Sequence, residues 1–250
     1  MLAPVLLLGV VLAAVATVVA VTYGSAGVPG DEARNRPEAA GARMDPLPAE
    51  PPPPLEPMAP PFEQPRYRDS RAVGLPYAGR LERGVQFPAG GPSFFTWDPI
   101  FRTTPDRGWR RYATDDTVRT ILRVLEEFRA AHPDAPRVGV GDLSRPRGGD
   151  FGPRFGSIGH ASHQNGLDAD VYYPRHDRRE AAPRTPAQVD QVLSQDLVDR
   201  FVRAGAERVF VGPSLTLTGP GRVVSKLPHH DNHLHVRFAK PRNRKPIRDA

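Results

Sequence analysis

The chain has 250 residues and no cysteine, which excludes disulfide bonds, cysteine-ligated zinc and a cysteine nucleophile. Its formal net charge is +6, but residues 1–65 carry three arginines against seven acidic residues, so residues 66–250 carry +10. A basic domain favours a polyanionic surface such as nucleic acid, anionic lipid or an acidic cell-wall polymer.

Residues 2–21 form an apolar run whose one polar residue is Thr17. A helix of about 20 residues spans the hydrocarbon layer of a bilayer, and the run lacks the basic start of a cleaved signal peptide. We therefore predict that residues 1–26 are a transmembrane anchor, with a signal peptide cleaved near residues 24–26 as the alternative. Either role exports the rest of the chain to the periplasmic or cell-wall side of the cytoplasmic membrane.

Residues 27–66 are predicted to be a disordered, proline-rich linker. Twelve of the thirty prolines fall between residues 27 and 65, and four of them are consecutive at 51–54. Such a segment forms an extended, semi-rigid spacer that holds a domain away from the membrane. A single folded domain is expected over residues 67–241, followed by a basic tail over 242–250.

Two helices are predicted in this domain. Residues 114–132 repeat apolar side chains at helical spacing, with Thr114 as the cap and His132-Pro133 as the stop. A second helix is expected directly behind a capping box that starts at Thr185, and it should end at Gly205. Its inward-facing side chains would be Val189, Val192, Leu193, Leu197 and Phe201.

Strands are predicted at residues 85–87, 137–143, 167–173, 207–211 and 233–238. Alternation within two of them places polar side chains on one face. These side chains are Asp168, Asp170 and Tyr172 in the first, and His233, His235 and Arg237 in the second. Because helices and strands do not alternate regularly, we expect an α+β fold with a central antiparallel sheet flanked by helices.

Six of the eight histidines fall into two clusters, within residues 160–170 and 229–235. Imidazole nitrogens and carboxylate oxygens are ligands that Zn²⁺ accepts, and a catalytic zinc takes three of them and keeps one position open for water. A loop that enters a strand brings His163 and Asp170 to one point, and His235 on the later strand supplies the third ligand. We therefore predict a Zn²⁺ site of His163, Asp170 and His235.

The other clustered histidines are candidates for catalysis. His233 lies two residues before His235 and so points into the same cavity, where an imidazole takes up and returns a proton at neutral pH. His230 and His160 are candidates for transition-state contact or for support of the ligands. Neither cluster contains a glutamate, so a histidine must act as the general base. Water activated by zinc predicts hydrolysis of an amide or ester.

These residues match the motifs of a known family. The broad pattern is His163, six residues, Asp170, and later His233-Leu234-His235. The narrower signature is GDLSRPRGG at 141–149, HASHQ at 160–164 and HDNHLHVR at 230–237. Over about residues 75–240 the chain resembles the penicillin-insensitive murein endopeptidases, zinc peptidases related to the D-Ala-D-Ala carboxypeptidases.

The resemblance implies zinc on His163, Asp170 and His235, with His233 and His230 lining the site and His160 close to the metal. It also implies the substrate, a peptide cross-link of peptidoglycan of the D-alanyl–diaminopimelate type. Peptidoglycan, and not nucleic acid, is then the expected partner, and the membrane is contacted through the N-terminal segment only. The sequence does not define an oligomeric state.

Three alternative functions are considered. One is a D-Ala-D-Ala carboxypeptidase of the same metal class. Another is a non-haem Fe(II) oxygenase, which also uses two histidines and a carboxylate. The third is a non-catalytic wall-binding module that keeps zinc for folding. His176 and Asp177 are a separate candidate pair for a second ion.

Overall fold

The computed structural model describes residues 62–155 and 160–240. The predicted membrane segment, most of the linker and the basic tail lie outside the described residues. Within the described residues, no helix combines the length and apolar character needed to cross a bilayer.

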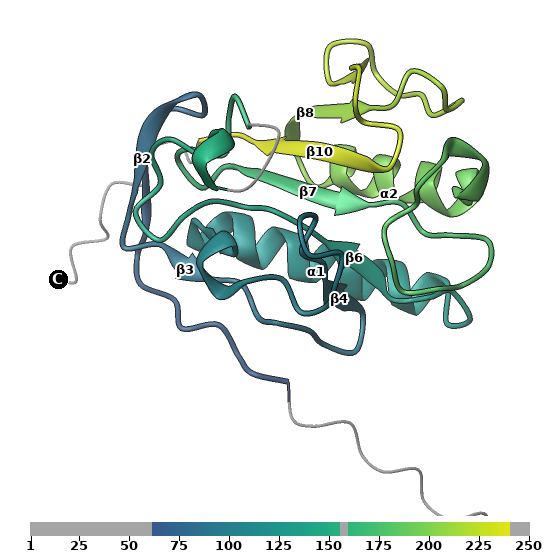
Figure 1. The fold of residues 1–250 in the computed structure, drawn as a ribbon, viewed down its shortest axis with the longest axis horizontal. Helices are drawn as coiled ribbons and strands as arrows, with labels where there is room; N and C mark the ends of the chain where they lie inside the picture. Colours follow the sequence, from purple (N-terminus) through teal and green to yellow (C-terminus); the bar gives the residue numbers. More distant parts are fainter. Residues whose placement is uncertain (1–61, 156–159, 241–250) are drawn as a thin grey trace, which may run out of the picture. The chain divides into compact units, whose positions relative to one another are not determined.

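A six-stranded sheet forms the centre of the fold, in the order β4-β6-β7-β10-β8-β9 (Figure 1). Its strands are β4 (Phe94–Thr96), β6 (Val138–Val140), β7 (Asp168–Tyr172), β8 (Ala206–Val211), β9 (Val224–Lys226) and β10 (His233–Phe238). The strands predicted over 137–143 and 167–173 are confirmed with shorter bounds. The strand predicted over 207–211 begins one residue earlier, and the strand over 233–238 has the predicted bounds.

The α+β class is confirmed, but the sheet is mixed and not antiparallel throughout. The four central strands pair antiparallel, whereas the outer pairs β4–β6 and β8–β9 are parallel. Parallel neighbours need a crossover connection that returns the chain to the same end of the sheet. Helix α1 (Asp115–Ala131) lies in the connection between β4 and β6.

Two small antiparallel pairs accompany the main sheet. They are β1 (Arg71–Leu75) with β2 (Ala78–Glu82), and β3 (Val85–Gln86) with β5 (Tyr112–Ala113). Three short 3-10 turns are η1 (Gly108–Arg110), η2 (Pro153–Phe155) and η3 (Pro186–Gln188). Of these elements, only β3 is predicted by the sequence.

The first helix is confirmed and the second begins later than predicted. The hydroxyl of Thr114 accepts a hydrogen bond from the Thr117 amide and caps α1, which ends at Ala131 with His132 as its C-cap. Helix α2 (Gln191–Arg203) is capped by Asp190, while the predicted capping residue, Thr185, makes no side-chain capping bond to a described residue.

The prediction that Val192 faces inward is therefore wrong. Val192 lies in the first turn of the shortened helix α2 and is 79% exposed. Leu197 and Phe201, one and two turns further along, are fully buried as predicted.

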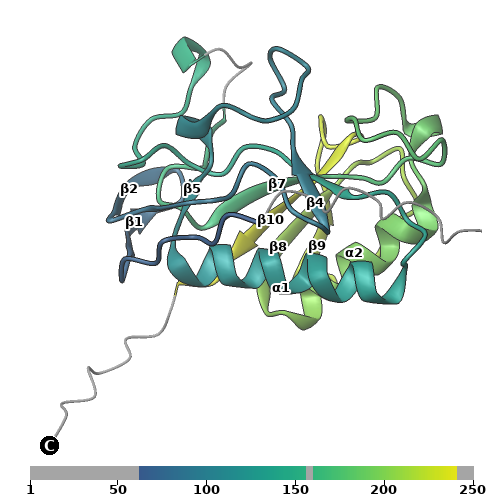
Figure 2. The same cartoon turned by 90° about the horizontal axis from the view of Figure 1, so that it is seen from below.

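Both helices cover one face of the sheet (Figure 2). On that side the core contains Leu234, Val236 and Phe238 of β10, and Phe238 packs its ring against Phe201 of α2. Because strand residues alternate between faces, the histidines of β10 lie on the face without helices.

Candidate metal centre

The central strands β7 and β10 bring the two predicted clusters together. Their register pairs Asp170 with His235, and Tyr172 with His233. Directly opposed residues of neighbouring strands project from the same face of a sheet. The alternation that is visible in the sequence therefore gathers these side chains on one surface.

Three histidine nitrogens surround one carboxylate oxygen, Oδ1 of Asp170. Nδ1 of His235 lies 3.2 Å from it, Nε2 of His163 3.3 Å and Nε2 of His233 3.6 Å. Ligands of a tetrahedral zinc, each about 2.0–2.1 Å from the ion, lie about 3.4 Å from one another. The distances of His163 and His235 from Oδ1 are therefore close to those between two ligands of one zinc ion.

Two of these atoms are buried without a hydrogen bond to any described residue, namely Nε2 of His163 and Oδ1 of Asp170. A buried polar group that stays unpaired costs about 1–3 kcal/mol. A divalent cation would satisfy both atoms, and imidazole with carboxylate is a donor set that zinc accepts. In the part of the chain that the structure describes, His160, His163 and Asp170 form a group that could hold a metal ion, with ligand atoms within 4.8 Å of one another.

The orientation of His163 is fixed on the side away from Asp170. Its Nδ1 lies 2.5 Å from the carbonyl oxygen of Leu143, so it must donate a proton there. In a neutral His163 ring, this leaves the lone pair of Nε2 pointing toward the carboxylate. The backbone of His163 has φ of +65°, and its amide donates to Oδ2 of Asp168.

The orientation of the His235 ring is fixed by the carboxylate of Asp168. Its Nε2 lies 3.1 Å from Oδ1 of Asp168, which also accepts a hydrogen bond of 2.8 Å from Nε of Arg237. A ligand histidine usually donates its second ring N–H to such a partner. Asp168 thereby leaves Nδ1 of His235 facing Asp170.

His160 lies beside the predicted ligands but makes a different bond. Its Nε2 is 2.7 Å from Oδ2 of Asp142 and 3.9 Å from Oδ2 of Asp170. The His160 and His163 rings have centroids 4.4 Å apart. Burial lowers the pKa of His160, but its hydrogen bond to Asp142 and the charge of Asp170 raise the pKa above its usual value.

His233 lies beside Asp170, and His230 lies against His233. Their rings stack with centroids 4.7 Å apart, and each Nδ1 is engaged locally, His233 with the Asn232 side chain and His230 with the Pro228 carbonyl. Burial lowers the pKa of His233 to about 4, against the opposing effect of Asp170. At neutral pH His233 is therefore a neutral imidazole that can accept a proton.

The predicted ligands carry opposite charges when no metal is present. Burial raises the pKa of Asp170, but the charges of His163 and His233 outweigh it and hold the pKa well below its usual range. Burial lowers the pKa of His235, but its hydrogen bond to Asp168 and the nearby charge of Asp170 raise the pKa to about 9. Metal ligands must be deprotonated, so a bound cation would displace the proton from His235.

The structure brings the predicted site residues to one place. His163, Asp170 and His235 meet as described, His233 and His160 contact the same carboxylate, and His230 stacks on His233. The pair proposed for a second ion does not form a site, because Asp177 pairs with Arg175 and the His176 ring contacts the Ala187 carbonyl.

The sequence reasoning missed the residues that support the site. Asp142 follows strand β6, and its partner Arg110 ends the short turn η1, which the sequence does not predict. Asp168 lies on the same predicted strand face as Asp170, so the alternation pattern could have identified it.

Comparison with protein families identifies one family that matches the chain. The family model described as penicillin-insensitive murein endopeptidase matches residues 72–215, more than half of the chain. The matched range contains His160, His163 and Asp170 and ends before the second histidine cluster. No curated protein matches the chain.

Proposed function

Because the chain belongs to the penicillin-insensitive murein endopeptidase family, we propose that it is a zinc-dependent endopeptidase that hydrolyses the peptide cross-links of peptidoglycan. The family supports a murein peptidase that acts at the cell wall or in the periplasm. The use of zinc and the choice of the D-alanyl–diaminopimelate bond are our proposals. The N-terminal segment would deliver the domain to that side of the membrane.

Zinc would be held by Nε2 of His163, the carboxylate of Asp170 and Nδ1 of His235. Bound zinc lowers the pKa of a coordinated water and polarises a carbonyl group, which is the chemistry that amide hydrolysis needs. The observation that carries this proposal is the pair of buried, unpaired donor atoms on His163 and Asp170 within the described residues.

The remaining histidines supply proton transfer and substrate contact. His233, whose pKa is lowered to about 4, is neutral at neutral pH and can accept a proton from the attacking water. It then returns the proton to the leaving amine. His230, whose ring lies against that of His233, would limit the freedom of that ring, and His160 would contact the substrate.

Incubation of the purified full chain with murein sacculi and with cross-linked muropeptide dimers tests the proposal. Mass analysis should show dimers opened at the D-alanyl–diaminopimelate bond, and EDTA should stop the reaction until zinc is returned. Loss of a terminal alanine with intact cross-links would instead indicate the carboxypeptidase. Binding to sacculi without cleavage would indicate the wall-binding module.

The Asp170→Ala variant tests the ligand assignment. It should lose both bound zinc and activity, whereas Asp177→Ala, which removes an acid that pairs with Arg175 away from the site, should retain both. Zinc content is measured by mass spectrometry of the purified protein. Full activity in Asp170→Ala would remove Asp170 from the ligand set.

A further inference from the structure

A buried ion pair lies behind His160, apart from the proposed metal ligands. Arg110 and Asp142 are fully buried, and Nε of Arg110 is 2.5 Å from Oδ1 of Asp142. A second bond joins Nη2 of Arg110 to Oδ2 of Asp142. This two-point contact fixes the plane of the carboxylate, which a single bond would not.

The carboxylate that Arg110 holds is the one that contacts His160. Oδ2 of Asp142 accepts the hydrogen bond from Nη2 of Arg110. The same oxygen lies 2.7 Å from Nε2 of His160. Because Oδ2 is shared, the position of the guanidinium determines where the imidazole nitrogen lies. Arg110 therefore positions Asp142, and Asp142 in turn positions His160.

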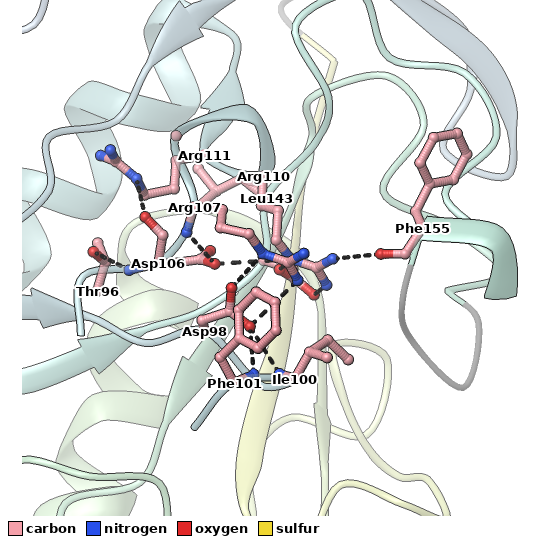
Figure 3. Close-up of polar contacts among 12 residues, drawn as sticks. Thr96, Asp98, Ile100, Phe101, Asp106, Arg107, Arg110, Arg111, Leu143 and Phe155 are labelled. Carbon is pink, nitrogen blue, oxygen red and sulfur yellow. Dashed lines mark hydrogen bonds and ion pairs between the residues drawn. The ribbon is translucent and has the colours of Figure 1, made fainter. Parts of the chain in front are cut away.

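Arg110 is itself held on several sides. Its Nη1 donates to the Phe155 carbonyl at 2.9 Å, and Figure 3 shows the guanidinium extended toward that oxygen. The rings of Trp109 and Phe151 lie 5.0 Å and 4.9 Å from the guanidinium carbon. Phe151 also packs against the His160 ring, with centroids 5.1 Å apart.

The backbone around Asp142 is tied to the proposed ligands as well. The amide of Asp170 donates to the Asp142 carbonyl at 2.9 Å, and the Leu143 carbonyl accepts from Nδ1 of His163. One short segment therefore sets the positions of His160, His163 and Asp170 relative to one another.

We propose that Arg110 and Asp142 are positioning residues that hold His160 as a substrate contact and keep it out of the metal ligand set. The bond to Asp142 occupies Nε2 of His160 and leaves Nδ1 as the ring nitrogen available to substrate. This assigns the third ligand position to His235 instead of His160. The inference rests on the proposed function where it is tested by kcat. Its test by the protonation of the His160 ring does not need that function.

A double-mutant cycle on the full chain tests the order of dependence. Asp142→Asn should lower kcat on a muropeptide dimer by about 10–100-fold, as is usual for residues that orient a site. In the His160→Ala background the same substitution should change kcat by less than about 3-fold, because it acts through the missing ring. An equal loss in both backgrounds would show that Asp142 acts on the fold and would overturn the proposal.

A matched control comes from a neighbouring pair of the same kind. Asp98 is buried and pairs with Nε of Arg107, but its other contacts are the amides of Ile100 and Phe101, not a histidine (Figure 3). Asp98→Asn should show the same kcat ratio with and without His160. Coupling to His160 as strong as that of Asp142 would mean that the effect is not specific to the buried pair.

Arg110→Lys covers the case in which Asp142→Asn does not fold. Lysine keeps the charge but cannot form the two parallel bonds, so kcat should fall by a smaller factor that again disappears without His160. If Arg110→Lys has wild-type kcat, arginine does not position the carboxylate.

The imidazole nitrogens of His160, observed by nitrogen-15 NMR in the zinc-free chain, give a readout that needs no activity. In the wild type, Nε2 should carry a hydrogen. In Asp142→Asn, the hydrogen should no longer be held preferentially on Nε2. A wild-type Nε2 without hydrogen would overturn the proposal. If the chain cleaves no murein, the proposed function fails, and the NMR result still decides whether Asp142 orients His160.

Discussion

At the scale of single residues, Asp168 supports two predicted ligands at once, His163 and His235. Its two oxygens contact the His163 amide, the His235 ring and the Arg237 guanidinium. Burial raises its pKa, but the hydrogen bond and charge of His235 outweigh burial and hold the pKa below its usual range. A carboxylate in this position fixes the tautomer of a ligand histidine and increases its basicity.

We therefore expect Asp168→Asn to weaken metal binding by about 10–100-fold without removing a ligand. Competition with a coloured chelator measures the zinc affinity directly. Asp177→Asn, which changes an acid paired with Arg175 outside the site, is the control and should leave the affinity unchanged. Equal affinities for Asp168→Asn and the wild type would show that Asp168 does not act on the metal through His235.

Asp106 is a buried carboxyl group whose contribution to the free energy of unfolding should depend on pH. Its Oδ2 has no hydrogen-bond partner among the described residues, and burial together with the charge of Asp142 raises its pKa from 3.8 to about 8. Between these values the folded chain keeps a proton that the unfolded chain has lost. The stabilising contribution of Asp106 is therefore complete below about pH 4 and lost as the pH rises through about 8.

Asp106→Asn should remove this dependence, because asparagine does not titrate. Relative to the wild type, the variant should gain up to about 1.4 kcal/mol of unfolding free energy per pH unit across this window. Urea unfolding at pH 5 and pH 8 measures the difference. A variant that loses stability with pH as steeply as the wild type would contradict the assignment.

At the scale of elements, the start of α2 shows where local sequence signals fail. Thr185 and Pro186 favour a helix start, and a 3-10 turn does form at Pro186–Gln188. Val189 is then drawn into the core in extended conformation, and the Asp190 amide bonds the Pro174 carbonyl. These tertiary contacts interrupt the helix, which restarts at Gln191 with Asp190 as its cap.

Substitutions of Asp190 and Thr185 test which of the two residues caps α2. Oδ1 of Asp190 accepts hydrogen bonds from the amides of Val192 and Leu193, so Asp190→Ala should lower the unfolding free energy by about 1 kcal/mol. Thr185→Ala, which removes no capping bond between described residues, should change it by a few tenths of that. Both values come from urea denaturation, and a larger loss for Thr185→Ala would restore the cap expected from sequence.

Local patterns predicted the elements that carry the site better than the contacts behind it. Alternation placed Asp170 and His235 on polar strand faces, and the register of β7 and β10 then joins them. The pair of Arg110 and Asp142 joins two segments 32 residues apart, and neither local pattern contains a signal for the other. The parallel edge strands were missed for a related reason, because their pairing depends on crossovers and not on strand periodicity.

At the scale of the whole molecule, the proposed metal would link segments that are distant in the sequence. His163 precedes β7, Asp170 lies within β7 and His235 lies in β10, the two strands at the centre of the sheet. The unfolded chain does not hold these donors together. The free energy of metal binding therefore adds to the stability of the folded state.

Zinc should accordingly raise the melting temperature of the EDTA-treated full chain in a concentration-dependent way. At a free concentration of 100 times Kd, the added stability is about 2.7 kcal/mol, and each kcal/mol shifts the melting temperature of a domain of this size by about 2–4 °C. Calorimetric scans over a zinc titration measure the shift, with Asp177→Asn expected to keep it and Asp170→Ala to abolish it. A full shift in Asp170→Ala would mean that the ion stabilises the chain from somewhere other than the surface where β7 meets β10.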